Sequence, residues 1–343
     1  MKKNAYARAG VDVRRVKKMQ RTAAEMLAST FDARRGKLGM PLMGIGHYAG
    51  LIDIGSGRAL AMHTDGVGTK VLVAIQMGRY DTVGIDCVAM TVNDLICLGC
   101  EPVALLDYIA LEREDEAMVS EIMQGLVAGA KESSSAIVGG ETAIMGDLVE
   151  GFDLVSMGVG IVDRDSILDG SGLTEGDRVI GVASSGLHSN GYTLARKVLL
   201  ENHTLDEEVP ELGRTLGDEL LTPTRIYVKP ALRAIRDHEV HAVGHITGGS
   251  FSKLERLVGG RNLGFDLKLP SAPPIFRMIQ REGHLSGRDM LSTFNMGVGL
   301  CLCAPSGQAD EIAATFRKHG FAACDIGAVS RRRGVRVGSV SLV

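Results

Sequence analysis

Residues 62–70, Met-His-Thr-Asp-Gly-Val-Gly-Thr-Lys, constrain the fold of this chain more than any other stretch. The apolar run before them predicts a short strand that leads to Asp65. Gly66 and Gly68 then let the backbone turn sharply and leave its N–H groups open to an anion. Lys70 adds a positive charge, and Asp65 is able to hold a divalent cation against a phosphate. A plain strand-to-helix turn, capped by Asp65, is the alternative interpretation.

The spacing of these glycines excludes two common phosphate-binding loops. The chain contains no Gly-x-x-x-x-Gly-Lys-Ser/Thr sequence and no Gly-x-Gly-x-x-Gly sequence. The function of the turn must therefore be judged from the partners that the rest of the chain supplies.

Composition sets the class of protein. The chain has 343 residues, enough for two domains, with 45% apolar and 23% charged residues, as in soluble globular proteins. A net charge of −3 provides no basic field, so we expect no nucleic acid partner. The 44 glycines and the absence of Trp indicate many tight turns and few surfaces for base stacking.

The cysteines and the N-terminus predict a cytoplasmic protein. Cys97 and Cys100 have the spacing of a metal or redox pair, but no second such pair or nearby His completes a zinc site. Cys301 and Cys303 lie in an apolar, strand-like run. We interpret both pairs as buried structural thiols in a reducing compartment. The N-terminus has no apolar signal segment, and no run is long enough to span a membrane.

Alternating strands and helices indicate an α/β fold with mixed sheets. Glycine-rich residues 36–50 are expected to form a loop that can order over a ligand. Helices are predicted over 12–28, 87–98, 117–133, 193–201, in the stretch introduced by 222–228, over 251–258 and over 308–319. Strands are predicted over 51–54, 59–63, 104–111, 136–142, 152–162, 178–183, 240–246, 296–304, 324–328 and 334–340.

A polar segment divides the chain. Residues 163–177 are rich in Asp, Ser and Gly, which is typical of a linker. We therefore predict an N-terminal domain over 1–165 and a C-terminal α/β domain over 166–343.

Three carboxylates follow or interrupt apolar segments of the first half. Asp65 and Glu141 each end a predicted strand, and Asp94 lies on the helix between them. A carboxylate within an apolar helix is costly to bury without a function, although Asn93 and Asp94 can also form a locally hydrogen-bonded pair. The functional interpretation is that Asp94 joins Asp65 at a metal ion.

The second half offers two further glycine-containing turns. Residues 184–191 and 247–250 each follow a predicted strand and precede a helix, and the first also supplies Ser, His and Asn side chains. Backbone N–H groups at a helix N-terminus bind anions, although a capping turn has the same pattern. Together with the three carboxylates, these turns indicate an enzyme that uses ATP–Mg²⁺ and a phosphorylated co-substrate.

Longer motifs make the chain similar to a known family. They are Tyr6-x-x-Ala-Gly-Val-Asp12, Thr64-Asp-Gly-Val-Gly-Thr-Lys70, Gly84-Ile-Asp-x-Val-Ala-Met90, Val92-Asn-Asp94, Val138-Gly-Gly-Glu-Thr-Ala143, Ser184-Ser-Gly-Leu-His-Ser-Asn-Gly-Tyr192, Pro223-Thr-Arg-Ile-Tyr-Val-Lys229, His245-Ile-Thr-Gly-Gly249 and Thr293-Phe-Asn-Met-Gly-Val-Gly299. On these motifs the chain resembles the phosphoribosylformylglycinamidine cyclo-ligases, the aminoimidazole ribonucleotide (AIR) synthetases, over almost its whole length.

The resemblance implies a two-domain fold whose N-terminal domains form a β-barrel between the subunits of a homodimer. It implies ATP-dependent ring closure of formylglycinamidine ribonucleotide in purine biosynthesis, with Mg²⁺. The implied ATP-binding residues are Asp65, Gly66, Gly68, Thr69, Lys70, Asp94, Gly139, Gly140 and Glu141. The implied metal ligands are Asp65, Asp94 and Glu141. The implied substrate-binding residues are Ser185, Gly186, Ser189, Asn190, Thr247, Gly248, Gly249 and Asn295. The implied catalytic residues are His188, His245 and Lys70.

The chain departs from the family pattern in two loops. His47 and Tyr48 replace a glycine and a phenylalanine, and residues 144–146 read Ile-Met-Gly instead of Glu-Met-Pro. Because of these changes, the sequence does not determine the structure of the loop that would cover the substrate. Two alternatives also remain: a sister enzyme, such as a thiamine-phosphate kinase or selenophosphate synthetase, and a non-catalytic nucleotide-binding regulator. The motifs around His188 and His245 favour the cyclo-ligase.

Overall fold

The structure is a computed structural model that describes residues 13–342. Its first half forms a five-stranded sheet in the order β1-β2-β5-β3-β4, in which only β3 and β4 run parallel. The strands are β1 (Gly50–Gly55), β2 (Arg58–Gly66), β3 (Glu101–Leu111), β4 (Ala136–Ile144) and β5 (Phe152–Asp163). The helices of this half are α2 (Val13–Ala28), α3 (Val71–Met77), α4 (Asp81–Ile96) and α5 (Glu116–Ser133).

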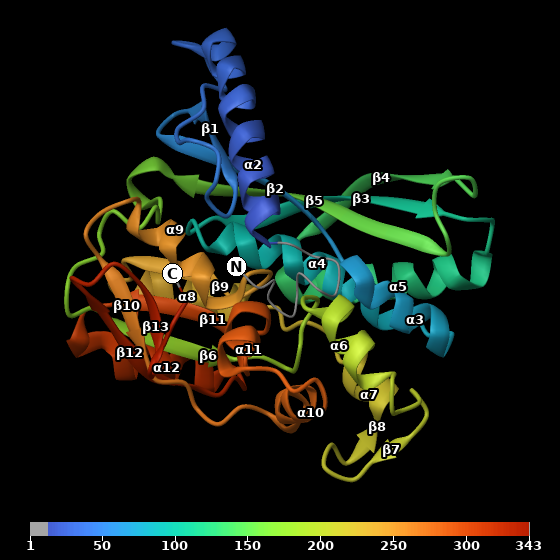
Figure 1. Ribbon diagram of the computed structural model, residues 1–343. Coiled ribbons are helices and arrows are strands. Elements are labelled where there is room, and N and C mark those ends of the chain that lie inside the picture. The colour runs from blue at the N-terminus through green and yellow to red at the C-terminus, as the bar shows by residue number, and fades with distance from the viewer. Residues whose placement is uncertain (1–12, 343) are drawn as a thin grey trace.

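Helices α4 and α5 cover one face of this sheet (Figure 1). They approach closely at Gly84 and Gly125, where an added Cβ at Gly84 would lie 2.3 Å from the backbone N of Leu126. Helix α4, which was expected over 87–98, begins six residues earlier, at Asp81. Gly84 obscured this start because a glycine normally weakens a helix, whereas here it permits helix packing.

The opposite face of the sheet is left uncovered by the described chain (Figure 1). Leu106 and Tyr108 of β3, Val138 of β4 and Met157 of β5 are exposed there. Helix α2 projects from the body and also exposes apolar residues, including Met19 and Met26. Apolar residues exposed together on one face are typical of an interaction surface.

The second half is built on a seven-stranded sheet in the order β14-β13-β10-β12-β6-β11-β9. Its strands are β6 (Arg178–Ala183), β9 (Ala242–His245), β10 (Gly264–Leu267), β11 (Val298–Ala304), β12 (Ala323–Ser330), β13 (Gly334–Val337) and β14 (Val340–Ser341). The helices are α6 (Tyr192–Leu199), α7 (Leu216–Leu220), α8 (Val228–Asp237), α9 (Glu255–Val258), α10 (Pro274–Glu282), α11 (Gly287–Thr293) and α12 (Ala309–Lys318). A small hairpin pairs β7 (Glu208–Val209) with β8 (Arg214–Thr215).

The architecture confirms the expected α/β fold with mixed sheets. Between the 3-10 helix η1 (Ser29–Arg34) and β1, residues 36–49 form no helix or strand. A single bridge from Pro41 to Ile52 joins this segment to β1. Helices α3, α7, α10 and α11, strand β10 and the hairpin of β7 and β8 were not predicted. The predicted boundary at 165/166 falls in the 3-10 turn η3 (Arg164–Ser166), between β5 and β6. Residues 6–12 of the first family motif lie outside the described residues.

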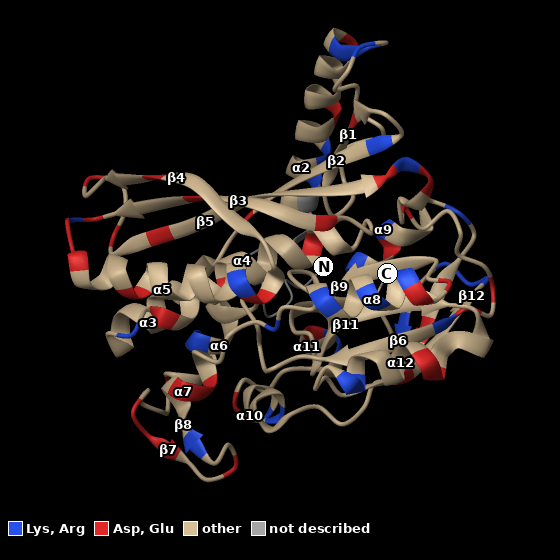
Figure 2. Cartoon of the chain, turned by 180° about the vertical axis from the view of Figure 1, so that it is seen from behind, with Lys and Arg blue, Asp and Glu red and all other residues tan. Residues whose placement is uncertain are grey.

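Lys and Arg are interspersed with Asp and Glu along the chain, and the long strands β3, β4 and β5 contain few charged residues (Figure 2). Within the described residues, no helix has the length and apolar character needed to cross a membrane.

Candidate functional site

Asp94 lies at the centre of the candidate site, near the C-terminal end of α4. Its side chain is 3% exposed, and its Oδ1 accepts a hydrogen bond from His245 Nδ1 at 2.7 Å. Burial alone raises the pKa of the Asp94 carboxyl, but the hydrogen bond from His245 and nearby positive charges lower that pKa below its usual value. Asp94 is therefore an ionised carboxylate held in a buried position.

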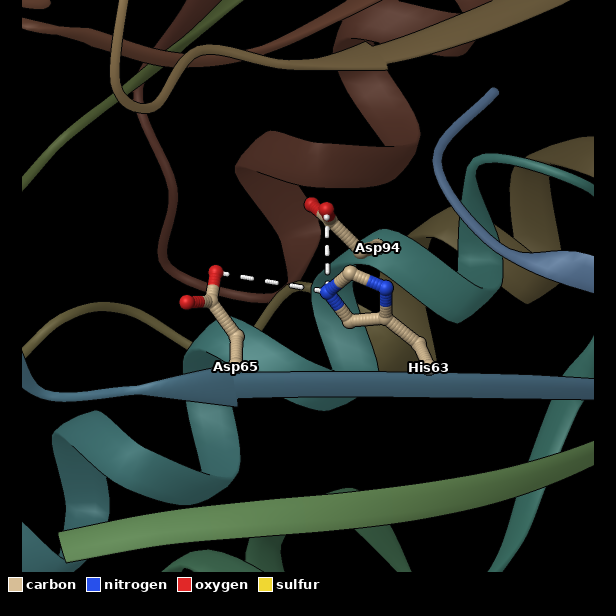
Figure 3. A group of neighbouring side chains, drawn as sticks. All are labelled: His63, Asp65 and Asp94. Carbon is tan, nitrogen blue, oxygen red and sulfur yellow. Dashed lines mark ion pairs between the residues drawn. The ribbon is translucent and has the colours of Figure 1, made fainter. Parts of the chain in front are cut away.

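Strand β2 brings two more ligating groups to Asp94. His63 and Asp65 are two residues apart on the strand, so both face α4. His63 Nε2 lies 3.3 Å from Asp94 Oδ2 and 4.0 Å from Asp65 Oδ2 (Figure 3). His63, Asp65 and Asp94 each offer one possible ligand atom, and these three atoms all lie within 4.8 Å of one another. The structure thus brings together the predicted pair, Asp65 and Asp94, and adds His63.

Glu141 is not part of this group. Across the sheet, Asp65 pairs with Ser156, Ser156 with Asp107, and Asp107 with Gly140. Strand spacing then places Gly140 about 14 Å from Asp65. Glu141 pairs instead with Tyr108 and shares the uncovered face with it. Within one chain the structure therefore does not bring Glu141 to Asp65 and Asp94.

Of the two glycines before Glu141, Gly140 has a steric reason to be a glycine. A Cβ at Gly140 would lie 2.5 Å from Asp107 Oδ1, and one at Gly139 would lie 3.4 Å from Leu106 Cδ2. Gly140 thus allows β4 to pack closely against Asp107 of β3, whereas a Cβ at Gly139 would make only an ordinary contact with Leu106. Their predicted role in ATP binding stays a prediction.

Lys70 is buried rather than directed at the surface. After Gly68, which has a φ of +69°, the chain forms the 3-10 turn η2 (Gly68–Lys70), and Thr69 Oγ1 lies 3.1 Å from Thr193 Oγ1. Lys70 is fully buried, with Nζ 2.7 Å from Asp86 Oδ2 and donating to the carbonyl of Thr222 at 2.7 Å. Burial lowers the pKa of Lys70, and Asp86 opposes that shift. Its ammonium group binds protein groups in this structure.

Asp86 links the two halves of the molecule. Its Oδ1 accepts hydrogen bonds from the backbone N–H of Thr224 at 2.7 Å and from Ser189 Oγ at 3.1 Å. Since Asp86 belongs to α4 and both donors belong to the second half, the predicted turn at 184–191 is fixed against α4. Ser189 is 5% exposed, so in this structure its hydroxyl holds the turn.

His188 has a strained backbone, with a φ of +63°, and a buried ring. Its Nε2 accepts the backbone N–H of Ser185 at 3.2 Å, so Nδ1 carries the proton of the neutral ring and has no partner. Burial, followed by the positive charges of neighbouring groups, lowers the pKa of His188 well below its usual value. The ring is neutral near pH 7, and its basic nitrogen is occupied.

His245 has the opposite arrangement. A carboxylate only accepts, so Nδ1 donates to Asp94, and Nε2 is the ring nitrogen left to act as an acceptor. Nε2 is buried without a hydrogen-bond partner. Of the two predicted catalytic histidines, His245 is the one whose basic nitrogen is free.

Other predicted substrate residues hold the two turns in place. Asn295 Nδ2 donates to the carbonyls of Gly186 and Leu187, which fixes the first turn. Asn190 approaches the second turn, because a Cβ at Gly248 would lie 3.0 Å from Asn190 Oδ1. The structure thus places the two turns side by side.

The second turn is held by a half-buried cation. Thr247 Oγ1 accepts a hydrogen bond from Lys253, and Gly249 adopts a φ of +85° before the helical residues begin. Burial lowers the pKa of Lys253, an effect that Asp94 opposes. Lys253 thus adds positive charge beside Asp94.

The divergent loop residues pack onto the second half. Arg256 lies over the Tyr48 ring, at 5.5 Å, and approaches the carbonyl of His47. Tyr48 Oη and both ring nitrogens of His47 are buried without hydrogen-bond partners. Burial lowers the pKa of His47 to about 4. These unpaired polar atoms lie in the loop that was expected to close over a ligand.

Sequence reasoning missed His63, Asp86 and Lys253. A signal existed for the first two: His63 stands two residues before Asp65 on a strand, and Asp86 is a carboxylate directly before the predicted helix of Asp94. Lys253 had no such signal, because its position depends on how residues 247–254 fold.

Comparison with known proteins assigns the family. The AIR synthase related protein N-terminal domain matches residues 46–162, and its C-terminal domain matches residues 174–339. The phosphoribosylformylglycinamidine cyclo-ligase of Thermococcus kodakarensis is 46% identical over 332 residues, which cover 97% of each chain. The chain belongs to this cyclo-ligase family. The resemblance drawn from the motifs is thereby confirmed.

Solved structures share the cyclo-ligase fold at lower identity. Thiamine-monophosphate kinase from Stenotrophomonas maltophilia is 21% identical, with a TM-score of 0.64, and the match covers 92% of this chain and 96% of that one. AaThiL complexed with AMPPCP and TMP is 17% identical, with a TM-score of 0.65, and the match covers 92% and 93%. These two likenesses show the fold alone.

Proposed function

We propose that this chain catalyses ATP-dependent ring closure of formylglycinamidine ribonucleotide to AIR, with release of ADP and phosphate, in purine biosynthesis. The observation that carries the proposal is the 2.7 Å link between Asp94 and His245. One end of this link faces a candidate cation site, and the other is a free basic nitrogen. The phosphoryl transfer needs the cation, and the ring closure that follows needs the base.

The reaction has two steps. ATP transfers its terminal phosphoryl group to the formamide oxygen, which makes the attached carbon electrophilic and the oxygen a good leaving group. The amidine nitrogen then attacks that carbon, loses a proton to a base, and phosphate leaves. Enclosure of the site excludes water from the phosphorylated intermediate.

Asp65 and Asp94 are suited to hold Mg²⁺ on the ATP phosphates. Oxygen ligands are those that Mg²⁺ prefers, and Asp94 presents a buried, ionised carboxylate toward Asp65. The ion would neutralise the charge of the phosphates. Backbone N–H groups of the 66–69 turn bind phosphate oxygens beside it. Lys70 supports this turn through Asp86, so we assign it a positioning role in this conformation.

His245 is the base of ring closure in this proposal. Its Nδ1–H is fixed by Asp94, so Nε2 receives the amidine proton, and the resulting imidazolium is stabilised by the same carboxylate. The turns that contain Ser185 and Thr247 bind the ribose phosphate of the substrate. His188 keeps the first of these turns in shape.

The working unit is a homodimer. The uncovered face of the first sheet carries Leu106, Tyr108, Val138 and Met157, which a second copy would bury. Glu141 lies on the same face, so it acts at the subunit interface in a barrel made from two copies. The buried free thiols suit the cytoplasm as the compartment of the enzyme.

The test is AIR formation by the purified full chain with ATP, Mg²⁺ and synthetic formylglycinamidine ribonucleotide. We expect one ADP per AIR, and no AIR from the Asp94→Asn variant. ADP release with thiamine phosphate but not with formylglycinamidine ribonucleotide would identify a sister kinase instead. Absence of turnover with both substrates would identify a nucleotide-binding regulator.

A further inference from the structure

The ring of His63 contributes a nitrogen to the site, which otherwise consists of oxygen ligands. Its Nε2 is buried, has no hydrogen-bond partner, and points toward both Asp65 and Asp94 (Figure 3). The distances to the facing carboxylate oxygens are 3.3 and 4.0 Å, but neither contact has hydrogen-bond geometry. A buried nitrogen that faces two carboxylates without bonding to either lacks a partner that a cation would supply.

The distances suit a shared ion. Metal–ligand bonds of about 2.1 Å place neighbouring ligands of an octahedral ion about 3.0 Å apart and opposite ligands about 4.2 Å apart. The 3.3 and 4.0 Å separations lie within that span. Asp65 is 37% exposed at the end of β2, so its side chain has room to adjust.

The surroundings of the three ligands also resemble a metal site. Asp94 uses Oδ1 to accept the hydrogen bond from His245, which leaves Oδ2 facing His63. Metal-binding carboxylates are commonly oriented by such a hydrogen bond to the oxygen that does not bind the metal. Asp94 is 3% exposed, so its orientation is fixed before any ion arrives.

We propose that His63 is a metal ligand and that the site prefers a divalent cation that accepts nitrogen, of the Mn²⁺-to-Co²⁺ series, over Mg²⁺. Imidazole nitrogen binds these ions better than it binds Mg²⁺, which prefers oxygen and water. The inference deepens the proposed function, because it names the class of cation at the site where ATP phosphates would bind.

The test uses the full chain without nucleotide and titrates it with Co²⁺ and with Mg²⁺ in a calorimeter. Co²⁺ binding is also followed by its visible absorption, which reports a nitrogen ligand. Wild type is compared with His63→Gln, and His319→Gln is the control because His319 is an exposed histidine. We expect His63→Gln to weaken Co²⁺ binding at least about tenfold and to alter its spectrum. Mg²⁺ binding should change less, and the control should match wild type.

His63→Asp supplies a second measurement. It replaces nitrogen with oxygen, so the ratio of Co²⁺ to Mg²⁺ affinity should fall at least about tenfold. Equal Co²⁺ affinity and an equal spectrum in wild type and His63→Gln, both folded by circular dichroism, would overturn the proposal. An unchanged affinity ratio in His63→Asp would also overturn it.

Failure of this inference is distinguishable from failure of the proposed function. If wild type forms AIR while His63 has no effect on Co²⁺ binding, His63 is only a neighbour of the two carboxylates. If Co²⁺ binding depends on His63 but no AIR forms, the metal assignment holds and the reaction does not.

Discussion

His245 Nδ1 lies 2.7 Å from Asp94 Oδ1, so one hydrogen bond joins the end of β9 in the second sheet to α4 under the first. The residues are 151 positions apart in the chain. This bond fixes the proton on Nδ1 and leaves Nε2 basic, as in histidine–carboxylate pairs that remove protons from substrates. The orientation of Asp94 and the position of the proton on His245 therefore each depend on a residue from the other half of the molecule.

Replacement of Asp94 by Asn should abolish ATP turnover without unfolding the protein. An amide oxygen at this position still accepts the hydrogen bond from His245, but the negative charge that holds the cation is lost. We expect ADP release to fall at least about a hundredfold, as when one charged group is removed from a phosphoryl-transfer site. The circular dichroism spectrum should match wild type. Unchanged Mg²⁺ dependence in the variant would remove Asp94 from the metal ligands.

Two matched substitutions should separate the roles of the histidines. Asn at position 245 keeps a donor near Nδ1 but removes Nε2, and Gln at position 188 keeps an acceptor near Nε2. We expect His245→Asn to slow ring closure at least about a hundredfold while phosphoryl transfer continues, seen as positional isotope exchange in ATP. His188→Gln should change ring closure much less. Wild-type ring closure in both variants would assign the base to water or to the 44–50 loop.

Removal of the Lys70 ammonium should destabilise the fold. Lys70→Met leaves the Asp86 carboxylate buried without its counter-ion, which costs about 3–5 kcal/mol in free energy of unfolding, measured with urea. The double variant Lys70→Met/Asp86→Asn should recover part of this loss. The exposed Lys318→Met is the control. Wild-type stability together with weakened ATP binding by calorimetry would show that Lys70 grips phosphate directly.

The stability of the protein should decrease in acid, partly because of His47. Its pKa is lowered from 6.5 to about 4 by burial and by Arg256, so below pH 6.5 the unfolded chain binds the proton that the folded state excludes. Unfolding is then favoured as pH falls, by about 3 kcal/mol at most for this group. His47→Gln, which removes a ring with no hydrogen bonds, should flatten the dependence of Tm on pH between 7 and about 4. An equal dependence in the variant would contradict the assignment.

One cysteine should react in the folded protein. Cys324 is exposed, whereas the other five are buried. Burial raises the pKa of the Cys87 and Cys100 thiols to about 12, which disfavours the reactive thiolate. Ellman's reagent should therefore modify one thiol per native chain and six after denaturation. Modification of Cys97 in the native state would show that this region opens.

The sequence was sufficient for the fold class because its apolar periodicities are local. Strands β3 and β5 and helices α5 and α12 each show a regular pattern, and all four lie close to their predicted ranges. Helix α3 was missed because it is short and directly follows the glycine turn. The start of α4 was missed because the role of Gly84 depends on α5, a contact between distant segments.

The candidate site was predictable in its residue types but not in its pairings. Asp65 and Asp94 were recognisable as carboxylates next to apolar segments, and the structure brings them together. The burial of Lys70 was not recognisable, because its partner Asp86 and the Thr222 carbonyl are set by tertiary packing. The distance between Glu141 and Asp65 follows from strand order, which no local pattern specifies.

The hydrogen bonds of Asp86 have a consequence for how the enzyme moves. Any hinge that separated the halves near residue 165 would strip this buried carboxylate of Ser189 and Thr224, leaving it with Lys70 alone. Such a motion is costly because an underpaired charge would remain in an apolar interior. The halves should therefore unfold in one cooperative transition, and substrates should enter by displacement of surface loops while the two sheets keep their relative orientation.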